Sequence, residues 1–183
     1  MSVATMPPQM VRWSSSVGPD TSRVGGRRTI ALRTATPADA DVIHALIATH
    51  MADGHLLPRY REEIAVHAGR FVVATDGDQV VACAELAPLS RTVAEVRSLV
   101  VDTDARRAGV GLHIVNELIA RAAGTGFERL CAFTHAPSFF VRMGFSIVPH
   151  EWLPEKIATT CASCRQFRQC GQHAVVLPLG RTR

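Results

Sequence analysis

Residues 95–123 read EVRSLVVDTDARRAGVGLHIVNELIARAA, and this stretch predicts a strand, a tight loop and a helix in succession. The strand is indicated by the apolar, β-branched run Leu99-Val100-Val101, which Asp102 ends. The helix is indicated by apolar residues that share one helical face: Leu112, Val115, Leu118, Ile119 and Ala122. Gly109 and Gly111 let the intervening backbone curl closely, so that N–H groups at the helix N-terminus converge on one anion. We therefore expect this segment to bind a phosphate.

Two common phosphate-binding motifs are excluded. A dinucleotide fingerprint needs a third glycine at the place of Ile114, and a P-loop needs a Gly-Lys-Ser/Thr ending, whereas Lys156 is the only lysine. The remaining pattern, Arg106-x-x-Gly109-x-Gly111, resembles the pyrophosphate loop of the GNAT acetyltransferases. The resemblance implies that the loop amides bind the pyrophosphate of acetyl-CoA and that the preceding strand pairs with its pantetheine arm. The implied cofactor-binding residues are Leu99, Val100, Val101, Arg106, Arg107, Ala108, Gly109, Val110, Gly111 and Leu112.

The composition predicts a single domain with a core. The chain has 183 residues, of which 47% are hydrophobic, and no apolar run approaches the roughly 18 residues of a membrane span. We expect no membrane and no nucleic-acid partner, because the four arginines of the first 28 residues, less the charge of Asp20, account for three of the four net positive charges. Five cysteines and no signal peptide favour reduced thiols and a cytoplasmic location. A homodimer is left open.

Residues 1–28 are rich in Ser, Pro, Gly and Arg and contain only Asp20 as an acid. We predict a disordered N-terminal tail, with an organelle transit peptide as the alternative. Residues 29–183 then form the acetyltransferase domain, including a cysteine-containing segment at 154–173.

The expected element order is β-α-α-β-β-β-α-β-α-β. Thr36 is the predicted N-cap of the first helix, and Asp76-Gly77 predicts a hairpin turn. The fold class is α/β (α+β), with a mixed central sheet of about six to seven strands and about four flanking helices. This is also the order that the GNAT resemblance implies.

A narrower resemblance is carried by four further motifs. They are Glu95-Val-Arg-Ser-Leu99, Leu56-Leu-Pro-Arg59, Phe139-Phe-Val-Arg-Met-Gly-Phe145 and Leu153-Pro-Glu-Lys-Ile157, together with Cys161-x-x-Cys164 and Cys170. Their order is similar to that in short N-acetylglutamate synthase-like proteins. This implies an acetyl-CoA-dependent amino-acid N-acetyltransferase, with L-glutamate as the best acceptor and arginine biosynthesis as the pathway. The alternatives are another small amine or a protein N-terminus as acceptor, and a non-enzymatic module that senses CoA or metal.

Amide formation needs a base for the amine and donors for the oxyanion. Glu95 is a candidate base acting through a water, with Glu85 on the neighbouring strand as its competitor. The backbone N–H groups near Leu99 and Val100 are the implied oxyanion donors if the strand bulges there. The family's usual tyrosine acid is replaced by Phe140, so no general acid is assigned.

Arg97 lies two residues from Glu95 and projects from the same face of the strand. A buried arginine needs an anionic partner, which a dicarboxylic amino acid would supply; the alternative is a structural pair with Glu95 or Glu85. Ser98 faces the other way unless a bulge intervenes. Arg59 and Lys156 are further candidates for binding a carboxylate, with surface positions as the alternative.

Cys161, Cys164, Cys170 and His173 have spacing that suits a tetrahedral zinc site. A thiol-rich turn is the alternative. Cys83 and Cys131 are expected to be core residues.

Overall fold

The computed structural model describes residues 11–14, 29–51, 56–106, 108–164 and 166–180. Within them the strands are β1 (Val11–Ser14), β2 (Thr29–Thr34), β3 (Phe71–Asp76), β4 (Gln79–Pro88), β5 (Val93–Val101), β6 (Arg129–Thr134), β7 (Ser146–Val148) and β8 (His173–Pro178). The helices are α1 (Ala40–Met51), α2 (Arg61–Val66), α3 (Val110–Gly124), α4 (Pro137–Val141) and α5 (Pro154–Thr159). None of the described helices is long and apolar enough to span a bilayer.

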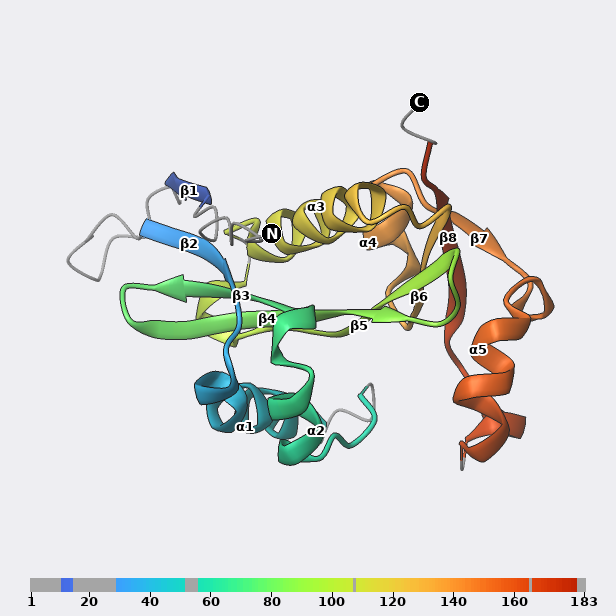
Figure 1. Cartoon of the computed structure of the whole chain (residues 1–183), viewed down its shortest axis with the longest axis horizontal. Helices are drawn as coiled ribbons and strands as arrows, with labels where there is room; N and C mark the ends of the chain where they lie inside the picture. Colours follow the sequence, from blue (N-terminus) through green and yellow to red (C-terminus); the bar gives the residue numbers. More distant parts are fainter. Residues whose placement is uncertain (1–10, 15–28, 52–55, 107, 165, 181–183) are drawn as a thin grey trace, which may run out of the picture.

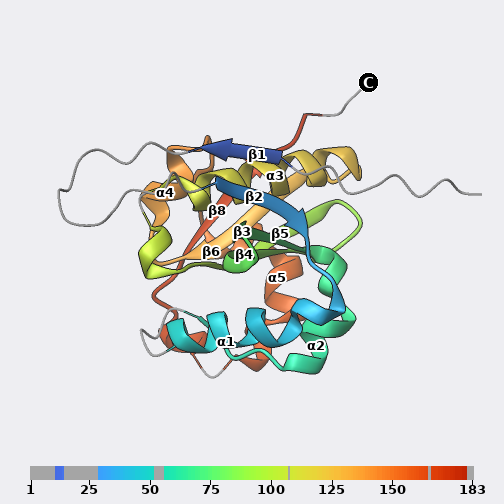
Figure 2. The same cartoon turned by 90° about the vertical axis from the view of Figure 1, so that its left-hand side faces the viewer.

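All eight described strands form one sheet in the order β1-β2-β3-β4-β5-β6-β8-β7. Neighbours are antiparallel except β5 and β6, which are parallel and are joined through α3. Helices α3 and α4 cover one face of the sheet, and α1 and α2 cover the other (Figures 1 and 2). The predicted mixed α/β class is therefore confirmed, and the α3 crossover places the glycine loop at one end of β5.

The N-terminal prediction needs a correction. Val11–Ser14 lies within the segment predicted to be disordered, but it pairs antiparallel with β2 as an edge strand. The rest of residues 1–28 lies outside the described residues. The described chain also contains one helix more than expected, because α5 forms within the segment 154–173, where Pro154 occupies its first turn.

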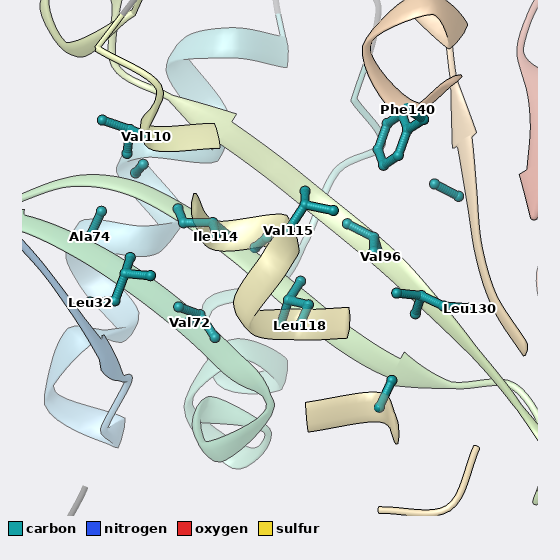
Figure 3. Packing of buried hydrophobic residues seen from close by; sticks show 14 of the residues in the cluster. Leu32, Val72, Ala74, Val96, Val110, Ile114, Val115, Leu118, Leu130 and Phe140 are labelled. Carbon is teal, nitrogen blue, oxygen red and sulfur yellow. The ribbon is translucent and has the colours of Figure 1, made fainter. Parts of the chain in front are cut away.

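The buried face of α3 differs from the prediction at two positions, Leu112 and Ile119, the second of which is only partly buried. Val110, Ile114, Val115, Leu118 and Ala122 are buried against the sheet, where they meet residues of β2, β3, β5 and β6 (Figure 3). Leu112 is instead 43% exposed. The sheet side of the helix is centred on Ile114 and Leu118, one turn apart, which rotates Leu112 away from it.

Two local features of β5 leave an opening in the sheet next to this strand. The β4–β5 register pairs Cys83 with Val100 but Glu85 with Arg97, so β5 carries one extra residue between them. Its pairing with β6 is limited to Val93–Glu95 opposite Arg129–Cys131. Because the strands pair only at this end, the C-terminal half of β5 is left beside an opening rather than a neighbouring strand.

Candidate active site

The extra residue in β5 is a β-bulge at Ser98. Ser98 has a φ of +55°, the one described non-glycine residue with a positive φ, and its carbonyl accepts a 3.7 Å bond from the Sγ of Cys83. A bulge leaves a residue unpaired and reverses which side chains face each side of the sheet. As a result the Ser98 hydroxyl lies on the same side as Arg97 and is 3.4 Å from Nη1 of Arg59. A bulge is required here if the backbone N–H groups near Leu99 and Val100 are to serve as oxyanion donors, and the structure has one.

A cavity of about 850 Å³ lies where β5 and β6 separate. Its walls are formed by 56–59, by 95–101 of β5, by 132–136 after β6, and by side chains from α4 and α5. Arg106 and Gly111 line one end and Arg97 and Lys156 line another part of the same space. One continuous cavity therefore joins the glycine loop to the residues predicted to bind an acceptor.

Two glycines determine the backbone shape of the cavity where it meets the N-terminus of α3. Gly109 is the N-cap of α3 with a φ of +73°, a left-handed conformation that L side chains disfavour. Having no side chain, it leaves the first N–H groups of α3 free of a side-chain cap, which suits an anion. At Gly111 a Cβ would lie 3.5 Å from Cγ2 of Val101 and 3.7 Å from Cζ of Phe139, in ordinary van der Waals contact with both.

Not every predicted cofactor residue lines the cavity. Leu99, Val100, Val101, Arg106 and Gly111 do. The side chain of Val110 is buried in the core and that of Leu112 is exposed, and neither residue is part of the cavity wall. Arg107 lies outside the described residues.

Arg97 pairs with Glu85, which is the structural alternative that the sequence left open. Glu85, fully buried on β4, accepts bonds at one oxygen, Oε2, from Nε of Arg97 at 3.0 Å and from Nη1 of Arg59 at 2.8 Å. Arg59 also donates to both oxygens of Glu63. The side chain of Arg97 stays 27% exposed and lines the cavity, while that of Arg59 is 6% exposed.

Glu95 and Lys156 form a second buried pair. Nζ of Lys156 lies 2.7 Å from Oε1 and 2.9 Å from Oε2 of Glu95, and 5.3 Å from the ring centre of Phe133. Lys156 is 6% exposed, so the alternative of a surface lysine is wrong. Both residues line the cavity.

The aromatic residues around the cavity do not supply a general acid. Phe140 is 4% exposed, packs edge-on against Phe139 and Phe145, and lines the cavity. Tyr60, the chain's single tyrosine, is 78% exposed and is not part of the cavity wall. No tyrosine hydroxyl is therefore placed beside the cavity.

The structure does not bring the four predicted zinc ligands together. Among the described residues there is no group of three or more His, Cys, Asp or Glu side chains that could hold a metal ion. His173 begins β8 opposite Thr134 in the sheet, and it is absent from the small cavity that Cys161, Cys164 and Cys170 line. Cys83 and Cys131 are buried core residues as expected, and burial raises the pKa of Cys83 to about 12 and raises that of Cys131 as well.

Sequence reasoning missed several residues of the cavity wall: His50, Glu63, His135, Thr160 and Gln172. For Glu63 a signal existed, because it stands four residues after Arg59 at helical spacing for an ion pair. The others come from segments far apart in the chain and carry no shared pattern.

The family model described as "Acetyltransferase (GNAT) family" matches residues 41–145, which is more than half of the chain. The chain belongs to the GNAT acetyltransferase family. An uncharacterized N-acetyltransferase of Chlorobaculum tepidum, CT2212, is 32% identical over 81% of this chain and 96% of its own length. The amino-acid acetyltransferase of Neisseria meningitidis is 30% identical over 69% of this chain but only 29% of its own length. This GNAT chain thus spans less than a third of the amino-acid acetyltransferases it matches.

Solved GNAT structures agree with these relationships. N-acetylglutamate synthase from Neisseria gonorrhoeae, complexed with coenzyme A and N-acetyl-glutamate, aligns with a TM-score of 0.75 and 27% identity over 83% of this chain and 35% of that chain. Rv2747 from Mycobacterium tuberculosis, in complex with CoA and NLQ, aligns with a TM-score of 0.69 and 25% identity over 81% and 99%. Both neighbours hold coenzyme A.

Proposed function

We propose that this GNAT protein transfers the acetyl group of acetyl-CoA to the α-amine of an amino acid, with L-glutamate as the preferred acceptor. The observation that carries the proposal is the single cavity that joins the N-terminus of α3 to Arg97 and Lys156. The product would be N-acetyl-L-glutamate, which enters arginine biosynthesis. The N-acetyl-glutamate and coenzyme A held by the N. gonorrhoeae enzyme support this assignment.

The charges of the cavity favour an anionic acceptor. Its charged lining side chains are four cations and two carboxylates: Arg59, Arg97, Arg106, Lys156, Glu63 and Glu95. Arg106 lies at the loop end, where it suits the cofactor phosphates. Arg97, near the carboxylates of Glu85 and Glu63, and Lys156, paired with Glu95, line the other part of the cavity. A dicarboxylic amino acid offers two carboxylates that charge-assisted bonds can hold there, which orients its amine.

Glu95 is the better candidate for the base. Glu95 is one of the residues that line the cavity, whereas Glu85 is fully buried behind two guanidinium groups and is not. In the proposed reaction the ammonium loses its proton toward Glu95 through a water, and the amine then attacks the thioester carbon. The developing oxyanion is stabilised by backbone N–H groups at the bulge, near Leu99 and Val100. With Phe140 in place of tyrosine, the coenzyme leaves as a thiolate or takes a proton from water.

The test is turnover with acetyl-CoA and a panel of acceptors, read as acetylated product by mass spectrometry. We expect glutamate to be acetylated fastest and glutamine, which lacks the second carboxylate, to have a much higher KM. Preference for an uncharged amine or a peptide N-terminus would overturn the glutamate assignment. Absence of turnover with every acceptor would overturn the enzymatic assignment.

A further inference from the structure

A second cavity, of about 360 Å³, lies next to the acceptor end and is lined by three thiols. Cys161, Cys164 and Cys170 share its wall with apolar side chains that include Ile157 and Phe167. The proposed acetyl transfer uses none of these cysteines. Three thiols in one small space make a site whose chemistry differs from that of the main cavity.

The backbone brings two of these cysteines together. Cys161–Ser163 forms a 3₁₀ turn, and the N–H of Cys164 donates a 3.0 Å bond to the carbonyl of Cys161. A turn closed by this i to i+3 bond holds its end Cα atoms within about 7 Å. Disulfides span Cα separations of roughly 4.4–6.8 Å, so the turn already has the reach that a bond between the two sulfurs needs. Because both side chains line the same cavity, they also extend into the same space.

We propose that Cys161 and Cys164 form a reversible disulfide by exchange with low-molecular-weight disulfides, and that this bond alters the acceptor end of the active site. One protein thiolate attacks a sulfur of the small disulfide, breaks its S–S bond and releases one small thiolate. The second protein thiolate then attacks the mixed disulfide and releases the other. Two protein thiols are oxidised, the small disulfide is reduced to two thiols, and the two protons pass to the leaving thiolates.

Either thiol of the turn can begin the exchange, because Cys161 and Cys164 are both partly buried and line the same cavity. Burial raises the pKa of the Cys161 thiol, which lowers its thiolate fraction at neutral pH and slows attack from that side. Cys83 and Cys131 take no part, because burial encloses both of them in the core.

The connection to the acceptor end runs through α5. Lys156 lines both cavities, as do Leu57, Thr160 and Gln172. Lys156 stands five residues before Cys161, and its carbonyl accepts the N–H of Thr160 at 3.0 Å, directly before the cysteine turn. A covalent bond that tightens this turn therefore acts on the end of the helix that carries Lys156.

The experiment incubates the full chain in buffers with a graded ratio of oxidised to reduced glutathione, followed by alkylation in denaturant and peptide mass spectrometry. We expect a disulfide between Cys161 and Cys164 to increase with oxidised glutathione, while Cys83 and Cys131 remain alkylated. Cys161→Ser should trap glutathione on Cys164, Cys164→Ser should abolish the disulfide, and Cys170→Ser should leave it intact. Full alkylation of both cysteines in the most oxidising buffer, or a disulfide that includes Cys170, would refute the site.

The effect on the acceptor rests on the proposed function and is measured separately. We expect a several-fold change in the acceptor KM of the oxidised protein, with the KM for acetyl-CoA unchanged, and reversal by a reducing agent. An unchanged acceptor KM overturns the connection through α5. Absence of turnover in the reduced protein counts against the proposed function instead, and the mass spectrum still decides whether the disulfide forms.

Discussion

Nζ of Lys156 and Oε1 of Glu95 lie 2.7 Å apart, and their side chains are 8% and 3% exposed. The two residues are 61 positions apart in the chain, so this pair joins α5 to β5 at the cavity wall. An ion pair this deeply buried depends on both partners, because each charge alone would be stranded away from water.

Lys156→Met should therefore destabilise the protein by about 3–5 kcal/mol, since it leaves the Glu95 carboxylate buried without its partner. The double variant Lys156→Met/Glu95→Gln should recover most of this loss, because no uncompensated charge remains. Urea denaturation of the three proteins measures the difference. Equal stability of the single and double variants would show that the pair is not coupled in this way.

Arg97→Ala should raise the acceptor KM by about 10–150-fold, the equivalent of about 1.5–3 kcal/mol for hydrogen bonds to a charged group. The fold should tolerate this change, because Arg59 still bonds Glu85 at 2.8 Å. Arg61→Ala is the control, since Arg61 pairs with Asp41 on the surface, away from the cavity. Steady-state kinetics checks both, and an equal response of the two variants would contradict a role for Arg97 in acceptor binding.

Arg59→Ala should behave differently from Arg97→Ala. Arg59 is buried and bonds both Glu63 and the fully buried Glu85, so its loss mainly lowers the free energy of unfolding. We expect a loss of about 3–5 kcal/mol, as for other broken buried ion pairs. Thermal or urea unfolding of both variants side by side tests this ranking, which fails if Arg97→Ala is the less stable.

Gly109→Val should abolish acetyl-CoA binding, because its φ of +73° strains a β-branched residue and reshapes the N-terminus of α3. Gly124→Ala, at the other end of the helix, meets no atom within 4 Å and should bind acetyl-CoA normally. Isothermal titration calorimetry compares them. If Gly109→Val binds as tightly as Gly124→Ala, the glycine loop is not the cofactor site.

The ion pair at the start of the first helix should contribute to the loss of folding stability at acidic pH. Arg33 donates to both oxygens of Asp39 at 2.7 Å, and this bonding, with help from Thr36, holds the pKa of Asp39 well below its usual value. A lowered carboxyl pKa stabilises the fold above the unfolded value of about 3.9, and the contribution is lost as the pH falls further. Asp39→Asn should therefore be less stable than wild type at pH 7, with the difference shrinking below about pH 4. Urea unfolding across pH 2–7 measures it, and a constant difference would contradict the assignment.

The local parts of the structure were predictable from the sequence. The strand, loop and helix of residues 95–123, the hairpin at Gly77 and the helix start at Thr36 depend on neighbouring residues, so their patterns are visible in the chain itself. The prediction for Leu112 was wrong because it placed the buried face of α3 at a different angle around the helix axis. Several apolar residues of α3 can define more than one face, and only packing against the sheet selects Ile114 over Leu112.

The sequence alone determined the family, the crossover helix and the glycine loop, because these follow from short patterns of residues. Only the tertiary structure decided which side chains meet around Arg97 and Lys156 in the cavity. The bulge that turns Ser98 toward Arg59, the choice of Glu85 as the partner of Arg97, and the pairing of Glu95 with Lys156 all join segments distant in sequence. The charge of an arginine or lysine does not depend on its position in the sequence. Which carboxylate it pairs with depends on which distant segments the fold brings together.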